Sequence, residues 1–227
     1  MARILVGLIA VVSFAAHLTA LPPTLEDSDS VNFALGVRHF DVAQHQPHPP
    51  GYPIFIALGK LGTSALTRAG IASPDVRGLA IWSAFAAGAL PFFIFAFFRR
   101  LGGDVPGESG DRRAAIATLL IVCNPLFWFT ATRPLSDMAG LAAAWAALAA
   151  LGSDLDFLPR VEHRDLTPRW LLVGAFLAGL SIGFRSQMAI LTMPLLLWVI
   201  VMVSRVRVQA IASVAAGVAA WAVPLIW

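Results

Sequence analysis

Long apolar runs, separated by short polar connections, dominate this chain. A helix needs about 20 mostly apolar residues to cross a bilayer. Runs that approach or reach this length cover residues 4–21, 78–98, 114–131, 138–151, 170–184, 188–203 and 209–227. The pattern predicts an all-α integral membrane protein with about seven transmembrane helices, and a count of six or eight fits nearly as well.

Two stretches need separate interpretation. Residues 4–20 could form a cleaved signal peptide, but a single basic residue, Arg3, precedes them and no small-x-small cleavage site follows. Residues 52–69 are apolar yet carry Lys60 and Arg68, which favours a helix lying in the membrane interface over a span. The polar region 22–77 is therefore expected to be a large first loop with interfacial helices.

The charge content agrees with a membrane protein. Only 13% of residues are charged, whereas soluble domains carry about 25%. The net charge of +3 comes mostly from arginines at segment ends, which suits membrane topology better than nucleic-acid binding. The single Cys123 excludes an internal disulfide framework.

Counting Lys and Arg by connection predicts the orientation. With the N-terminus in the cytoplasm, ten basic residues lie on that side and the remaining six on the other. We therefore expect a protein of the bacterial inner membrane whose first loop, 22–77, faces the periplasm (or a lumen).

The first loop holds the densest group of polar residues. The stretch "LEDSDSVNF" has the features of a helix start, with Asp or Ser as its cap. Phe33, Val37 and Phe40 follow at helical spacing and predict a short amphipathic helix that could lie on the bilayer. In "HQPHPPGYP", four prolines restrict the backbone and Gly51 permits a sharp turn.

This order of residues resembles the first luminal loop of the GT-C glycosyltransferases, most closely the protein O-mannosyltransferase-like branch. That branch has a first-loop motif of roughly D-S-G-E-F, followed by H-P-P-G-Y-P. The matching residues here are Asp29, Ser30 and Phe33, then His48, Pro49, Pro50, Gly51, Tyr52 and Pro53, whereas Val31 and Asn32 depart from the Gly-Glu of the branch.

The resemblance implies a GT-C-like helical bundle that transfers a sugar, such as a mannose-like hexose. The donor would be a polyprenyl-phosphate sugar, and the acceptor a protein or a glycan on the non-cytoplasmic side of the bilayer. The family's first-loop Asp acts as general base, and this role maps to Asp29. Asp27 competes for it, and because the two would point about 200° apart on a helix, we expect only one to face the pocket.

His48 and Lys60 are candidates for substrate binding in the same loop. His48 is expected to shape the pocket through hydrogen bonds, although a metal site with His45 and either Asp29 or Asp41 is an alternative. Lys60 could contact a lipid phosphate or simply extend to the membrane surface. We expect no cofactor and no resident metal, with a divalent ion left open.

Three further candidates lie outside the first loop. Arg133 and Asp137 are four residues apart, so on a helix one would lie above the other, either in a substrate site or as a structural ion pair. Asp137 loosely matches a Glu that the branch carries in its second loop. Arg185 lies between two apolar segments, where charge is costly and often functional, although it could be a snorkelling turn residue.

Two other function classes remain open. A catalytically silent membrane scaffold or assembly factor could retain such a loop. A transporter is less favoured, because the polar residues lie outside the spans. The apolar end of the chain predicts that residues 1–227 are the N-terminal module of a longer protein.

Overall fold

The structure is a computed structural model that describes residues 1–101, 108–153, 169–202 and 206–226. Regular secondary structure in these ranges is entirely helical. The elements are α1 (Ala2–Thr19), α2 (Ser28–Arg38), η1 (Val42–Gln44), α3 (Pro53–Arg68), α4 (Pro74–Leu101), α5 (Glu108–Val122), α6 (Pro125–Ala131), α7 (Asp137–Ser153), α8 (Arg169–Ile182), α9 (Met188–Met202), α10 (Arg207–Ala222) and η5 (Val223–Leu225).

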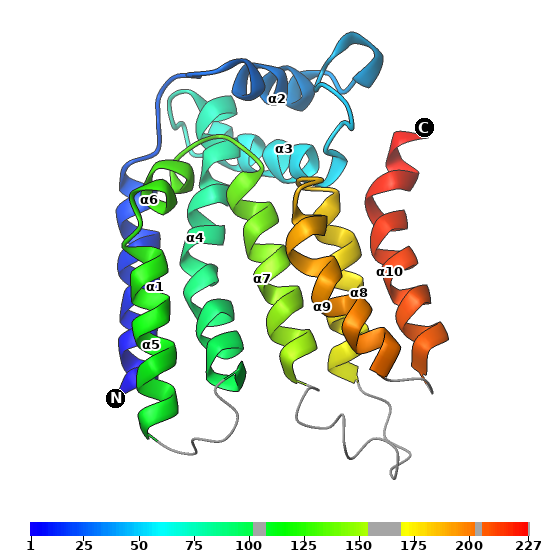
Figure 1. Ribbon diagram of the computed structural model, residues 1–227. Coiled ribbons are helices and arrows are strands. Elements are labelled where there is room, and N and C mark those ends of the chain that lie inside the picture. Colours follow the sequence, from blue (N-terminus) through cyan, green and yellow to red (C-terminus); the bar gives the residue numbers. More distant parts are fainter. Residues whose placement is uncertain (102–107, 154–168, 203–205, 227) are drawn as a thin grey trace.

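The long helices form a bundle whose members alternate in direction, and α2 and α3 lie across one end of it (Figure 1). The connections before α7 and between α8 and α9 lie at this same end, whereas the N-terminus lies at the opposite end. The all-α membrane fold is thus confirmed. Segments far apart in the sequence meet beneath α2.

The expected number of seven membrane spans is not confirmed. Within the described ranges, three helices are long and apolar enough to cross a bilayer: α1, α4, and α10 continued by η5. Residues 109–131 make a fourth only if α5 and α6, which are bent by 64° at a break, count as one span. Helices α7, α8 and α9 have 17, 14 and 15 residues, a rise of roughly 21–26 Å against a hydrocarbon core of about 30 Å.

The break in residues 109–131 has a local cause. The side chain of Asn124 accepts a hydrogen bond from the Leu126 backbone N–H at 2.8 Å, and so caps a new helix. Pro125 occupies the first position of that helix, where its missing N–H costs nothing. A capped start directly after α5 therefore turns α6 away from the α5 axis.

Helix α4 is the central packing element. Its buried residues contact α1, α3, α5 and α7, and Leu90 and Ile94 are fully buried. At its first turns, α4 meets α3 backbone to backbone: a Cβ on Gly62 would lie 2.2 Å from the Gly78 carbonyl oxygen. Small residues at such crossings let membrane helices approach closely. This contact holds α3 across the end of the bundle.

The apolar face of α2 packs on protein. Phe33 and Val37 are buried in a cluster with Phe55, Ile56 and Leu79 from α3 and α4. Phe40 lies beyond the end of the helix. The expected contact of this face with the bilayer is therefore wrong, because α3 already covers it. The first loop is docked onto the bundle as a fixed layer.

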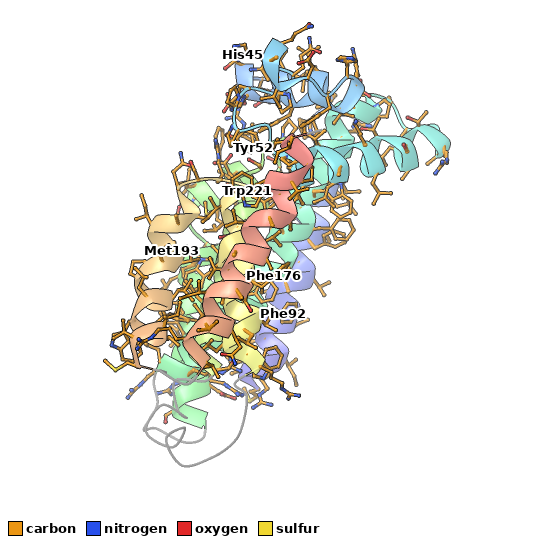
Figure 2. The ribbon with its side chains drawn as sticks, turned by 90° about the vertical axis from the view of Figure 1, so that its right-hand side faces the viewer. His45, Tyr52, Phe92, Phe176, Met193 and Trp221 are labelled. Carbon is orange, nitrogen blue, oxygen red and sulfur yellow. The ribbon has the colours of Figure 1, made fainter. Side chains whose placement is uncertain are left out.

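The turn-rich segment between α2 and α3 is held by its own backbone. Asp41 Oδ1 accepts hydrogen bonds from the N–H groups of Ala43 and Gln44, and Asp41 also forms a backbone bridge with Gln46. Gly51 has φ +91°, which a residue with a side chain rarely adopts. Tyr52 follows as the N-cap residue of α3, and it lies below His45 at this end of the molecule (Figure 2).

Candidate active site

The two candidate carboxylates at the start of α2 have different surroundings. Asp27 is the N-cap: its Oδ1 accepts a hydrogen bond from the Ser30 backbone N–H at 2.7 Å, and the Ser30 hydroxyl completes a capping box. Its second oxygen, Oδ2, accepts a hydrogen bond from Arg133 Nη2 at 2.8 Å. Both oxygens of Asp27 are therefore committed to structural contacts.

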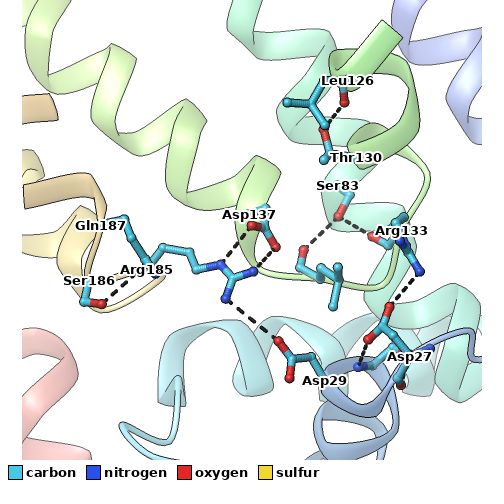
Figure 3. Close-up of polar contacts among 12 residues, drawn as sticks. Asp27, Asp29, Ser83, Leu126, Thr130, Arg133, Asp137, Arg185, Ser186 and Gln187 are labelled. Atoms are coloured by element: carbon cyan, nitrogen blue, oxygen red, sulfur yellow. Dashed lines mark hydrogen bonds and ion pairs between the residues drawn. The ribbon is translucent and has the colours of Figure 1, made fainter. Parts of the chain in front are cut away.

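Asp29 lies in the first turn of α2 with a freer carboxylate. Its side chain is 39% exposed and faces Arg185, with 4.0 Å between Asp29 Oδ2 and Arg185 Nη1. Figure 3 shows Asp29 and Asp27 side by side, each directed at a different arginine. The two carboxylates thus have different cationic partners, Arg133 for Asp27 and Arg185 for Asp29.

Arg185 is held rigidly in the turn between α8 and α9. Its Nε and Nη2 donate to the two carboxylate oxygens of Asp137, at 2.9 and 2.6 Å, in the forked geometry that suits a guanidinium (Figure 3). Burial lowers the pKa of Arg185, but the Asp137 contact outweighs it and the pKa is raised overall. The site therefore contains a permanent positive charge whose Nη1 faces Asp29.

The expected pairing of Arg133 with Asp137 is wrong. Arg133 lies in the connection between α6 and α7, which contains Pro134, and α7 begins only at Asp137. No helix spans the two residues, so the spacing of four does not bring them together. Arg133 instead pairs with Asp27 and, at 3.4 Å, with Glu26, while Asp137 pairs with Arg185.

A serine on α4 fixes the connection between α6 and α7. The Ser83 hydroxyl lies 2.7 Å from the Arg133 carbonyl oxygen and 3.0 Å from that of Leu135. The guanidinium of Arg133 also lies over the Phe129 ring, 4.6 Å from its centroid. Arg133 is therefore a clamp that joins the start of α2 to the bundle.

A family model described as the protein O-mannosyl-transferase TMEM260 N-terminal domain matches residues 39–210, about three quarters of the chain. The chain belongs to this family. No curated protein and no solved structure gave a match. Membership of this family indicates that the protein is an O-mannosyltransferase-like glycosyltransferase. Such an enzyme uses a sugar donor and a protein acceptor.

The family match covers the candidate residues unevenly. It includes His48, Lys60, Arg133, Asp137 and Arg185, all within residues 39–210. It begins after α2, so the match does not extend to either carboxylate at the start of that helix. The assignment of a general base to α2 therefore depends on the geometry and on the first-loop motif.

His48 and Tyr52 form an aromatic wall beside the site. The His48 ring lies 5.7 Å from that of Phe33 and 5.2 Å from that of Tyr52. His48 Nδ1 is buried and makes no hydrogen bond with the described part of the chain. Burial raises the pKa of Tyr52, against the opposing effect of the Arg185 charge. The Tyr52 phenol therefore stays neutral near Arg185 at physiological pH.

Lys60 lies apart from these groups. It is exposed on α3, two turns beyond Tyr52, and no ion pair among the described residues joins it to Asp29 or Arg185. The described residues also contain no group of three His, Cys, Asp or Glu side chains placed to hold a metal ion. The alternative of a metal site at His45 and His48 therefore has no support in the geometry.

The sequence did not single out Glu26, Ser83 or Tyr52 as parts of this site. Glu26 directly precedes the candidate Asp27 in the acidic run before α2, and Tyr52 lies within the HPPGYP motif, so both had a signal in the sequence. Ser83 has no comparable signal, because its contact with the connection before α7 spans about 50 residues of sequence.

Proposed function

We propose that this protein transfers a mannose-like hexose from a polyprenyl-phosphate donor to a hydroxyl group of a protein (or glycan) acceptor. Asp29 is the general base in this proposal. Its partly exposed carboxylate, which faces a fixed arginine and takes no part in capping the helix, is the observation that carries the assignment.

The different surroundings of the two carboxylates favour Asp29 over Asp27. A general base must reach the acceptor hydroxyl and have an oxygen ready to accept its proton. Asp27 has one oxygen on the Ser30 N–H and the other on Arg133. Using Asp27 as a base would disrupt both the helix cap and the clamp. Asp29 can accept a proton while both remain in place.

The proposed reaction is a substitution at the anomeric carbon of the donor sugar. The acceptor hydroxyl gives its proton to Asp29 as its oxygen attacks the anomeric carbon of the sugar, and the bond between this carbon and the phosphate oxygen breaks. The electron pair of that bond leaves with the polyprenyl phosphate, and the configuration inverts. Negative charge grows on the phosphate, so a nearby cation stabilises the transition state.

Arg185 is the proposed partner for this charge. Two of its donors are fixed on Asp137, which holds the guanidinium without using Nη1. Lys60 is a second candidate for the lipid phosphate, because an exposed lysine on α3 lies at the same end of the bundle as the site. His48 and Tyr52 are proposed to shape the sugar pocket with their rings.

We also propose that the end of the bundle with α2 and α3 faces the periplasm of a bacterial inner membrane. The N-terminus lies at the opposite end of the bundle (Figure 1). The larger share of Lys and Arg falls in connections on the N-terminal side, as expected for a cytoplasmic face.

The test is sugar transfer in membranes that contain the wild-type chain, Asp29→Asn or Asp27→Asn, with a panel of radiolabelled polyprenyl-phosphate sugars. Loss of a general base lowers a rate by roughly 10²- to 10⁴-fold, so we expect Asp29→Asn to lose at least about 10²-fold. Asp27→Asn is the matched control, because it removes a neighbouring charge and weakens the helix cap while leaving Asp29 in place.

Equal transfer by wild type and Asp29→Asn would refute the assignment of Asp29. A large loss in Asp27→Asn alone, at equal amounts of folded protein, would move the general base to Asp27. Absence of transfer from every donor would favour the silent membrane scaffold.

A further inference from the structure

A pocket lies where the end of α1 meets the end of α3 and the start of α4, and its volume is about 260 Å³. Its wall is aliphatic, built from leucines and isoleucines, except for Thr19 and Arg77. The proposed transfer reaction uses none of the lining residues, so the pocket requires a separate explanation.

Arg77 supplies the charge of this pocket and has no counter-charge in the described part of the chain. Its Nε is buried without a hydrogen-bond partner there, and its guanidinium forms no ion pair with a described carboxylate. The nearby Asp75 pairs with Arg38 instead. Arg77 is also the fourth residue of α4, near the helix end where the dipole disfavours a cation. A buried donor without a partner is costly, so these features favour an external anion as its partner.

The depth of the pocket matches that of lipid headgroups. Helices α1 and α4 are long and apolar enough to cross a bilayer, and the pocket lies at the paired ends of these two helices. Spans end where the hydrocarbon core gives way to the polar headgroups. Leu18 and Ile71 on the pocket wall are exposed. Figure 2 shows α3, in cyan, extending past the side of the bundle at this level.

From the unpartnered guanidinium, the aliphatic wall and this depth, we infer that the pocket binds the phosphate of a membrane glycerophospholipid. Arg77 would donate to the phosphate oxygens, for which a forked guanidinium is well suited. Leu18, Leu21 and Ile81 would contact the glycerol and the start of an acyl chain. Pockets that enclose a whole ligand begin at about 300 Å³, so 260 Å³ suits a headgroup whose chains lie in the bilayer.

The test is lipid binding to the full chain in detergent, with dioleoylphosphatidylglycerol compared with dioleoylglycerol, which has the same acyl chains but no phosphate. Native mass spectrometry gives the two affinities. Thermal unfolding gives a second measure, because a ligand of the folded state raises the melting temperature. We expect the phospholipid to bind at least about tenfold more tightly, since a hydrogen bond to a charged group contributes about this factor or more.

Arg77→Met removes the guanidinium and keeps much of the aliphatic stem. Without lipid it should unfold at the wild-type temperature or higher, because it also removes a buried donor that has no partner in the described part of the chain. It should lose the preference for the phospholipid, whereas Arg77→Lys keeps the charge and should retain part of it. Arg68→Met is the matched control: Arg68 is exposed at the end of α3 and does not line the pocket, so the preference should be unchanged.

Thr19→Phe tests the inference by shape, even if Arg77→Met fails to fold. It places a bulky side chain in the pocket without changing the charge, and should abolish most of the phospholipid binding. Thr19 is exposed, and its hydroxyl donates to the Ala16 carbonyl oxygen of its own helix, so the bundle should tolerate the change. Circular dichroism measures the helicity of every variant.

Equal affinity of the wild type for the two lipids would overturn the inference, as would an Arg77→Met variant that keeps the preference. An equal loss in Arg68→Met would also overturn it, because general surface charge would then account for binding. So would displacement of the phospholipid by millimolar inorganic phosphate, since a free phosphate would be a sufficient ligand. Tighter binding of a polyprenyl phosphate than of phosphatidylglycerol, lost in Arg77→Met, would replace the phospholipid by the carrier lipid.

Discussion

The forked pair between Arg185 and Asp137 allows a quantitative test of how the site is held. Arg185→Gln and Asp137→Asn, made singly and together, form a double-mutant cycle that isolates the interaction of the two side chains. Exposed ion pairs contribute about 0.2–1 kcal/mol, whereas removing one partner of a buried pair costs about 3–5 kcal/mol. With side chains 19% and 33% exposed and two hydrogen bonds at 2.9 and 2.6 Å, this pair lies between these cases. We expect a coupling of about 2 kcal/mol.

The assay is the free energy of unfolding of the four proteins in detergent micelles, followed by circular dichroism. Arg38 and Asp75 provide a matched control, because this ion pair also joins two elements of the chain, α2 and α4, but its arginine is 69% exposed. Its coupling should stay below about 1 kcal/mol. A coupling below about 0.5 kcal/mol for Arg185 and Asp137, or one no larger than the control, would refute the reasoning.

The same variants also separate positioning from chemistry. Asp137→Asn keeps both Asp29 and the Arg185 charge, but it releases the guanidinium from its fixed geometry. We expect sugar transfer to fall about 10- to 100-fold, since small displacements of catalytic groups are costly. Unchanged transfer in a destabilised Asp137→Asn variant would mean that this pair serves stability alone.

Two other predictions address packing and pH. Gly62→Ala would place a methyl group 2.2 Å from the Gly78 carbonyl oxygen and should destabilise the protein by at least about 2 kcal/mol. Gly7→Ala is the control, because its methyl group would enter open space and the change should be neutral or slightly stabilising. Thermal unfolding of both variants measures the difference, and equal melting temperatures would contradict the close helix crossing. Tyr52 is the only tyrosine of the chain, so the tyrosinate absorbance reports this residue alone, and its midpoint should lie above the ordinary value of 10.0. Because the folded chain then holds this proton more tightly than the unfolded chain, stability should fall as pH rises past about 10. Tyr52→Phe should lack this fall, and a midpoint at or below 10 would contradict burial of the phenol.

Local sequence signals were reliable where the structure depends on neighbours in the chain. The turn at Arg185 and the helix start near Asp27 both follow from short-range chemistry, a break between apolar runs and a capping sequence. The spacing of Arg133 and Asp137 was misleading because it assumed one helix through Pro134. A proline inside such a stretch disfavours a continuous helix, so that error could have been recognised in the sequence.

The sequence by itself determined the helical membrane fold, because long apolar runs with few charges satisfy their backbone groups in a bilayer only as helices. It also places the densest group of acids, histidines and prolines in the first loop, and the proposed chemistry is assigned there for that reason. Only the tertiary structure decided which acid is free. Arg133 lies 106 residues from Asp27 in the sequence, and Arg185 is still further from Asp29. The pairing of these residues depends on how the bundle brings distant connections to one end. No local pattern encodes that choice, since it arises from packing between helices distant in sequence.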